Sequence, residues 1–434
     1  MTMLATDRPT ATVSTTARWR RRILTRSGLI TGAFVVPAVV VRIAGLHTGA
    51  VLALLIFGAA VVAASFWLAW AAEAAQIDVS GGLATALLAL IAVLPEYAVD
   101  LYYAYVSGHN ADYTQYAAAN MTGSNRLLMG LGWPVVVLVS ILVARKPGSH
   151  KPTGLTLEPA NRVELGFLLI AGVLAFVIPV SGQIHFGLGL ALLAWFGFYL
   201  YKISHGDVEE PELIGTAAAL GDLPDGRRRV AVIGLFLVSA GVILLCAKPF
   251  ADNLVAAGTE LGINRFLLVQ WLAPLASEAP EFIIAIIFAT RGKGTAAIAT
   301  LISSKVNQWT LLIGSLPIAH LLGGGGFSLL LDSRQVEEVL LTATQTMMGV
   351  ALILALRFHR AAACTLLGLF VVQFPIFSTQ GRLLLCAVYT AVAIVGLIIN
   401  RRHVAATLAA PFFGTAIRHG GHVHHEPGDS TYPR

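Results

Sequence analysis

Charged residues are scarce in this chain. Lysine, arginine, aspartate and glutamate make up 12% of its 434 residues, whereas a typical soluble domain carries about 25%. So few charges cannot cover a water-facing surface, which excludes a soluble enzyme. Hydrophobic residues make up 56% instead, and apolar runs recur from Leu29 to Asn400. Each run is long enough to cross a hydrocarbon core of ~30 Å. The pattern predicts an all-α polytopic membrane protein.

Cysteine is also rare. Cys246, Cys364 and Cys386 all lie in apolar runs, and their spacing is typical of neither a zinc site nor a disulfide framework. We expect three buried structural thiols. The sequence has no His-Glu-x-x-His or comparable catalytic motif, so we expect neither an enzyme nor a cofactor. The polar, arginine-rich first 28 residues do not fit a cleaved signal peptide.

The apolar runs predict about 12 transmembrane helices. The expected spans are residues 29–45, 51–73, 81–106, 112–144, 161–180, 184–203, 229–249, 263–290, 294–322, 336–357, 361–378 and 382–400. The fourth and ninth spans are long for one straight crossing, which indicates tilted or broken helices.

Basic residues gather in the loops on one side of this layout. One side receives the clusters Arg18–Arg26, Arg145–Lys151, Arg227–Arg229, Arg291–Lys293, Arg357–Arg360 and Arg401–Arg402. Cytoplasmic loops carry the excess of lysine and arginine, so both termini are predicted to be cytoplasmic, in the cell (plasma or inner) membrane. The net charge of +6 then reflects loops at the inner surface rather than a nucleic-acid site.

The layout predicts seven segments. These are a basic cytoplasmic N-terminal segment (1–28), an accessory helix (29–50), a first repeat (51–203), a cytoplasmic hinge loop (204–228), a second repeat (229–380), an accessory helix (381–400) and a His-rich cytoplasmic tail (401–434). The tail histidines favour a solvated tail; metal binding or pH sensing is the alternative.

An internal repeat supports this division. Pro95-Glu96 in the first half matches Pro280-Glu281 in the second, and polar stretches follow at 120–125 and 303–307. Five spans in each half would give the halves opposite orientations. Inverted repeats with sites at broken helices are typical of transporters.

Glu96 and Glu281 are the principal candidate site residues. A carboxylate inside the bilayer is costly and is usually functional. Pro95 and Pro280 are expected to break their helices, since each proline removes one N–H and frees a carbonyl one turn earlier. These carbonyls would belong to Ile91 and Ala276. Carboxylate and carbonyl oxygens suit Na⁺ or Ca²⁺. The structural alternative is a proline kink whose glutamate merely forms an ion pair.

Further polar residues lie near this pair in the sequence. Asp100 and Glu278 fall within one helical turn of the two glutamates, and both are candidate cation ligands. Amides and hydroxyls on the following helices could complete coordination, or could instead join helices; they are Asn120, Ser124, Asn125, Ser303, Ser304 and Asn307.

Lys305 is an unusual member of this set. Its ammonium could balance a carboxylate or stand in for a transported cation. The alternative is that it snorkels to the inner interface, because Lys305 lies only 12 residues from Lys293. Arg126 raises the same question in the first half.

At these residues the sequence resembles the cation/calcium antiporter superfamily, which includes sodium/calcium and calcium/proton exchangers. Ala276–Glu281 resembles the family's Gly-Thr-Ser-x-Pro-Glu, and Asn120–Asn125 resembles its Gly-Asn-x-x-Gly-Ser-Asn. The resemblance extends loosely over residues 51–380. It implies ten core helices in two inverted halves, with Glu96 and Glu281 as the main cation ligands.

The sequence also departs from the family pattern. Ile91, Ala92 and Val93 replace the first Gly-Thr-Ser, Glu278 replaces the second serine, and Lys305 replaces an amide or acidic residue.

We therefore expect a secondary cation antiporter that exchanges Ca²⁺ for Na⁺ or H⁺, with a Na⁺/H⁺ antiporter as the alternative. Its expected partners are the lipid bilayer and small inorganic cations, with no nucleic acid. A channel is disfavoured, since it would not need paired carboxylates in an inverted repeat.

Overall fold

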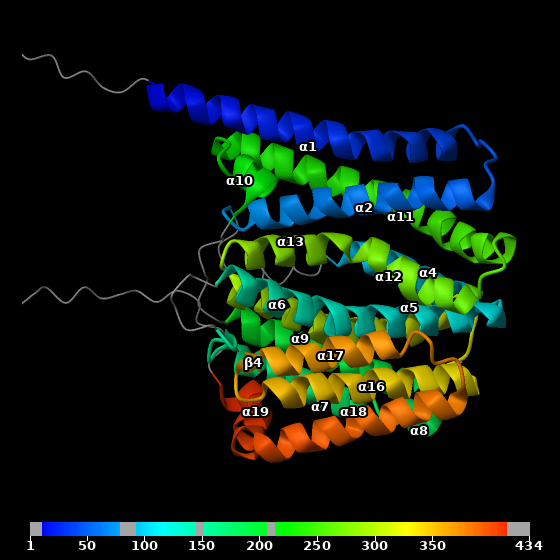
Figure 1. Cartoon of the computed structure of the whole chain (residues 1–434). Coiled ribbons are helices and arrows are strands. Elements are labelled where there is room, and N and C mark those ends of the chain that lie inside the picture. The colour runs from blue at the N-terminus through cyan, green and yellow to red at the C-terminus, as the bar shows by residue number, and fades with distance from the viewer. Residues whose placement is uncertain (1–10, 79–92, 145–151, 206–212, 415–434) are drawn as a thin grey trace, which may run out of the picture.

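The computed structural model describes residues 11–78, 93–144, 152–205 and 213–414. Within these residues the chain is a bundle of long helices that run between two ends (Figure 1). The start of α1 and the helix α19 lie at the same end of the bundle, which we call the terminal end. The opposite end is called the far end.

The helices of the first half precede residue 205. They are α1 (Ala11–Ile43), α2 (Ala50–Ala75), α4 (Leu94–Ser107), α5 (Thr114–Leu127), α6 (Trp133–Val143), α7 (Asn161–Leu174), α8 (Val177–Ser181) and α9 (Phe186–Ser204), with the 3₁₀-helix η1 (Ala111–Tyr113) and the π-helix η2 (Leu128–Gly132).

The helices of the second half follow residue 213. They are α10 (Gly215–Gly221), α11 (Asp225–Glu260), α12 (Arg265–Ser277), α13 (Ala279–Thr290), α14 (Gly294–Asn307), α15 (Ile313–Leu322), α16 (Ser333–Ile353), α17 (Arg360–Val372), α18 (Thr379–Ile399) and α19 (Arg401–Phe413), with the π-helix η3 (Gln308–Leu312).

Eight described helices or continuous helical segments are long and apolar enough to cross a membrane, and the bent pair α12–α13 brings the number to nine. Three further predicted crossings correspond to α4, to α14 with α15, and to α17. The helix α17 is apolar but has only 13 residues, and residues 79–92 before α4 lie outside the described part. A multi-pass membrane protein is confirmed, while the number 12 stays a prediction.

The fourth and ninth expected spans are interrupted, as their length predicts. Each contains a five-residue π-helix, η2 between α5 and α6 and η3 between α14 and α15. The eighth span is bent, since the axes of α12 and α13 differ by 55° across a break at Glu278. A π-turn shifts the hydrogen-bond register within a helix and is frequent at functional sites.

The helix α5 lies in the core of the bundle. Nearly all of its residues are buried, and a Cβ at Gly123 would lie 1.7 Å from the backbone carbonyl oxygen of Gln270. Only glycine therefore allows α5 and α12 to approach so closely. On one side of this core α1, α2 and α11 pack together, and on the other α16, α18 and α7 do so (Figure 1).

Short contacts fasten the bundle at both ends. Antiparallel strands pair residues of the two halves, β1 (Gly154–Thr156) with β4 (Arg357–His359) and β2 (Gln183–His185) with β3 (Ser328–Leu330). Past the end of α2, Asp78 accepts hydrogen bonds from Arg228 Nε at 2.7 Å and Nη2 at 2.8 Å. This guanidinium lowers the pKa of Asp78 to about 2.

Two expected segments contain more helix than the apolar runs alone predict. The helix α1 extends from the expected span back to Ala11, and part of the expected tail forms α19, which packs on α7. The expectation that all three cysteines are buried is wrong. Cys364 is exposed on α17, since an apolar side chain can face lipid as well as the core. The tail histidines at 419–425 lie outside the described residues.

Candidate functional site

Two short helices begin in the same way and carry the principal glutamates. The first three residues are Leu94-Pro95-Glu96 in α4 and Ala279-Pro280-Glu281 in α13. Proline is suited to the first turn because its missing N–H would have no helical partner there. The positive end of the helix dipole also favours a carboxylate in that turn. Both Pro-Glu pairs therefore occupy helix N-termini.

Glu96 and Glu278 are bridged by Gln308, which is not among the predicted site residues. Gln308 Nε2 donates to Glu96 Oε1 at 3.2 Å and to Glu278 Oε1 at 2.8 Å. The two carboxylates therefore lie close together, and both side chains are buried. Gln308 opens η3, one residue after Asn307. A polar residue that continues the Ser303–Asn307 stretch is the signal that could have identified it.

Glu281 lies at the edge of this group. It is half-buried, and its Oε2 atom is buried without a hydrogen-bond partner among the described residues. Glu281 interacts electrostatically with Glu96. The structure thus brings glutamates of both Pro-Glu pairs into one electrostatic environment, with Glu278 bridged directly to Glu96.

Asp100 and Asn120 form a second polar group on the neighbouring turns of α4 and α5. Both are fully buried. The Asn120 amide interacts with the Asp100 carboxylate, but no well-aligned hydrogen bond joins either group to another described residue. A buried polar group without a partner costs roughly 1–3 kcal/mol. Groups kept at such a cost inside a membrane protein are usually functional.

Lys305 is completely buried, so it does not snorkel to an interface. Its Nζ donates to the Asn125 backbone carbonyl and, at 2.8 Å, to Asn125 Oδ1. It also lies 5.6 Å from the centre of the Trp309 ring. The ammonium interacts electrostatically with Glu278 and Glu96. Lys305 is thus held by two oxygen atoms, as a bound cation would be.

Some of the remaining candidate ligands lie beside the carboxylates, and others contact neighbouring helices instead. Ser124 donates to the Asn120 carbonyl at 3.0 Å, and the Asn307 carbonyl accepts from Tyr97 at 3.2 Å. Ser303 instead contacts Tyr199 of α9, which also bonds Glu164 at 3.3 Å. Ser304 is half-buried on α14.

The donor set is almost entirely oxygen. Carboxylates, amide oxygens and backbone carbonyls are the ligands of hard cations. Among the described residues, no three histidine, cysteine, aspartate or glutamate side chains form a metal-holding group.

The fold and this polar interior define a class: a multi-pass membrane protein with broken helices and buried carboxylates at its centre. The chain belongs to the sodium/calcium exchanger protein family, whose model matches residues 49–204 and 231–379. Members of that family are transporters and not enzymes. This confirms the expectation of a cation/calcium antiporter drawn from the two Pro-Glu segments.

One solved structure supports the same family, and a second shares the fold. The chain in the crystal structure of the H⁺/Ca²⁺ exchanger CAX is 37% identical in sequence to this chain. The two structures match with a TM-score of 0.84 over 91% of this chain and 98% of that one. The structure of native YfkE is 18% identical, with a TM-score of 0.58 over 80% of this chain and 97% of that one; this likeness concerns the fold alone. No curated protein matches the chain.

Proposed function

We propose that this protein exchanges Ca²⁺ for H⁺ across the cell membrane, at a site built on Glu96, Glu278 and Glu281. The observation that carries the proposal is the pair of buried carboxylates that share the Gln308 amide at the break between α12 and α13. Glu96, Glu278 and Glu281 together carry three negative charges when ionised, and Lys305 offsets one of them. A divalent cation balances the two that remain.

The choice of H⁺ as the counter-ion rests on Lys305. Its ammonium occupies a position between two oxygen atoms of Asn125 that a monovalent cation would otherwise take. A site with one such position filled has less room for several Na⁺ ions. Buried carboxylates can instead accept protons when Ca²⁺ leaves. The 37% identity with a protein described as an H⁺/Ca²⁺ exchanger supports the same choice.

The transport cycle follows from the repeated architecture. The helices α5 and α14 both have 14 residues, and each leads into a five-residue π-helix. We infer that the halves are inverted repeats and that access alternates as outer helices move around the fixed site. The terminal end would face the cytoplasm, as the basic loops predict.

Purified protein in liposomes tests this proposal. Radioactive Ca²⁺ uptake should follow an imposed pH gradient and should not respond to a Na⁺ gradient alone. Glu96→Gln and Glu281→Gln should each abolish uptake, because glutamine keeps the shape and removes the charge that balances the cation. Glu260→Gln, at the end of α11, serves as a matched control and should transport normally. Normal uptake by either site variant would refute the proposed role of that glutamate.

The same vesicles distinguish the monovalent alternative. Lys305 leaves fewer cation positions, which also suits a Na⁺/H⁺ antiporter. Na⁺ movement driven by a pH gradient, without any Ca²⁺ movement, would replace the Ca²⁺ proposal with that alternative.

A further inference from the structure

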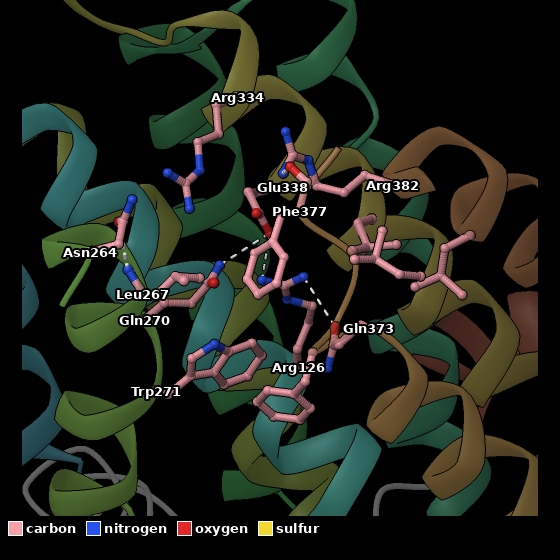
Figure 2. A pocket seen from close by; sticks show the side chains of 14 residues that line it. Arg126, Asn264, Leu267, Gln270, Trp271, Arg334, Glu338, Gln373, Phe377 and Arg382 are labelled. Carbon is pink, nitrogen blue, oxygen red and sulfur yellow. Dashed lines mark hydrogen bonds and ion pairs between the residues drawn. The ribbon is translucent and has the colours of Figure 1, made fainter. Parts of the chain in front are cut away.

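A second polar region lies at the far end, apart from the carboxylate site. A pocket of about 210 Å³ opens among α5, α12, α16, α18 and the segment that joins α17 to α18. Its polar lining includes Arg126, Arg334, Arg382, Gln270, Gln373 and Glu338 (Figure 2). Since a water molecule takes up roughly 30 Å³, the pocket has room for a small polyatomic ion.

The charges around this pocket are not balanced. Arg126 pairs with Glu338 at 2.6 Å, and Arg382 pairs with Glu337 at 2.7 Å. Arg334 has no ion pair with any described residue and instead stacks 4.1 Å from the Phe266 ring centre. Figure 2 shows the Arg334 and Arg126 guanidiniums on either side of Glu338. The residues that line the pocket thus carry three guanidiniums and one carboxylate, Glu338. Glu337, which pairs with Arg382, lies outside the lining.

The one other acidic side chain that interacts with Arg334 does not line the pocket. Asp332 is exposed, and its carboxylate caps α16 by accepting from the Gln335 backbone and side chain, both at 2.7 Å. It therefore leaves the pocket side of Arg334 without an acceptor.

Several buried donors in this region lack acceptors. Arg126 Nε, Arg334 Nε and Gln373 Nε2 have no hydrogen-bond partner among the described residues. Gln373 is 6% exposed, and its Oε1 accepts from Arg126 Nη1 at 3.1 Å. That bond leaves the amide nitrogen of Gln373 free to donate. A set of unpaired N–H groups calls for an acceptor with several oxygen atoms.

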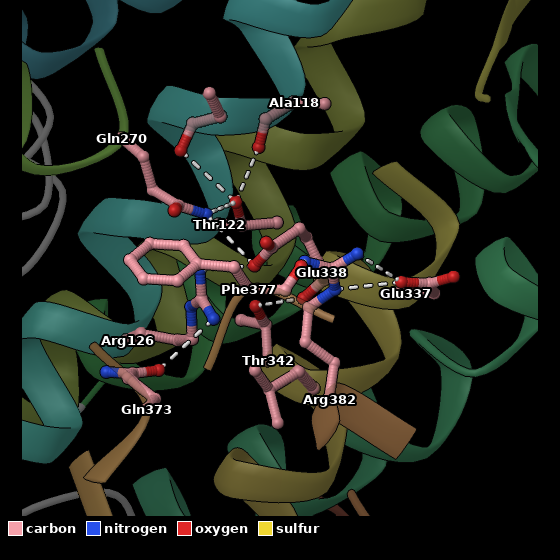
Figure 3. A network of polar contacts seen from close by, with 12 residues as sticks. Ala118, Thr122, Arg126, Gln270, Glu337, Glu338, Thr342, Gln373, Phe377 and Arg382 are labelled. Carbon is pink, nitrogen blue, oxygen red and sulfur yellow. Dashed lines mark hydrogen bonds and ion pairs between the residues drawn. The ribbon is translucent and has the colours of Figure 1, made fainter. Parts of the chain in front are cut away.

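A hydrogen-bond network fixes the position of Arg126. Gln270 Nε2 donates to Thr122 at 3.2 Å and to Glu338 Oε2 at 3.1 Å (Figure 3). Glu338 is thereby shared between Gln270 and Arg126. The guanidinium is held on the face of α5 that contacts α12 and α16, and it cannot turn away without breaking these contacts.

The excess positive charge argues against a cation path through this pocket. Three guanidiniums interact electrostatically here, with Arg126 and Arg382 repelling Arg334. We infer that the pocket is an oxyanion site, in which a phosphate-type or carboxylate-type anion accepts from Arg334, Arg126 and Gln373. Guanidinium groups match such oxygens in a planar fork, which a halide cannot use. The inference does not rest on the proposed cation site, although Arg126 follows Asn125 in α5 and interacts electrostatically with Lys305.

Thermal unfolding of the purified protein tests the oxyanion site. Sodium phosphate or sodium sulfate should raise the Tm of the wild type in a saturable manner, whereas sodium chloride at equal ionic strength should not. Arg334→Gln should weaken the apparent phosphate affinity at least tenfold, which corresponds to about 1.4 kcal/mol. Arg265→Gln is the matched control, since Arg265 is exposed at the start of α12 and does not line the pocket.

A second variant distinguishes loss of the anion site from misfolding of Arg334→Gln. Gln373→Leu removes an uncharged donor and should also weaken the phosphate effect. An equal response to chloride and phosphate, or an unchanged response in both variants, would overturn the oxyanion site. Nanodiscs with and without phosphatidylglycerol then separate the sources. If a lipid phosphate fills the pocket, phosphatidylglycerol should raise the Tm of the wild type but not of Arg334→Gln.

Discussion

Replacing Lys305 by asparagine tests how the buried ammonium sets the number of bound cations. Lys305 is the twelfth residue of α14, and Asn125 is the twelfth residue of α5. Equivalent positions of the two helices thus meet directly, because Lys305 Nζ bonds the Asn125 carbonyl and side chain. Lys305→Asn would place two amides opposite each other and would free both oxygen atoms of Asn125.

The size of the effect follows from the two hydrogen bonds. A hydrogen bond to a charged group contributes about 1.5–3 kcal/mol, so the pair contributes roughly 3–6 kcal/mol. A competing monovalent cation would have to overcome this amount, which is a factor of about 10² to 10⁴ in affinity. We therefore expect this position to be closed to a transported ion in the wild type.

Equilibrium binding and charge movement both measure the change. Lys305→Asn should bind more cations per protein than the wild type, and its transport should become dependent on Na⁺ or change its charge per Ca²⁺. Lys305→Met, which removes the ammonium without adding a ligand, should lose affinity without gaining a site. Identical stoichiometry and identical pH profiles in the wild type and Lys305→Asn would refute the reasoning and place Lys305 outside the site.

Three further predictions concern a hydrogen bond within the site and two contacts that hold the helix bundle together. Gln308→Leu should raise the KM for Ca²⁺ by about tenfold, because the bridging hydrogen bonds to charged groups are each worth about 1.5–3 kcal/mol; an unchanged KM in flux assays would count against the bridge. Gly123→Ala should lower the Tm by several degrees, because the new Cβ would meet a backbone carbonyl of α12 at 1.7 Å, whereas Gly241→Ala meets nothing within 4 Å and should be neutral. Asp78→Asn should lower the Tm by removing the charge that binds Arg228. Because the pKa of Asp78 is lowered from 3.8 to about 2, its stabilising effect is complete above pH 3.8 and is lost only as the pH falls through about 2. The Tm difference should therefore be constant between pH 5 and 9, and a difference that varied in that range would contradict the assignment.

The sequence predicts the local features of this protein well. Apolar runs predict the membrane helices, and Pro95 and Pro280 mark the starts of α4 and α13. The length of the fourth and ninth spans predicts their interruption. These features depend on neighbouring residues, so their signals are visible in a short window of sequence.

Contacts between residues far apart in the sequence cannot be predicted from such a short window. Gln308 meets Glu96 from 212 positions away, and Lys305 meets Asn125 from 180 positions away. The sequence suggests that Lys305 balances a carboxylate, whereas its direct hydrogen bonds go to an amide and a backbone carbonyl. The far-end pocket was missed because its arginines come from three separate helices, and only Arg126 lies near the predicted site residues.

The two halves differ at two positions of the proposed site, where the second half has one acidic and one basic side chain in place of uncharged ones. Glu278 precedes α13 where Val93 precedes α4, and Lys305 takes the position in α14 that Asn125 has in α5. At these two positions the second half carries an acid and a base that the first half lacks, whereas the first half has Asp100 where the second has Ala285. The two added groups interact with each other across the buried site. An added carboxylate or ammonium alone would leave an uncompensated buried charge, which costs several kcal/mol. Together the two groups add no net charge to the proposed site, and we therefore expect a lysine to lie inside it without expelling the cation.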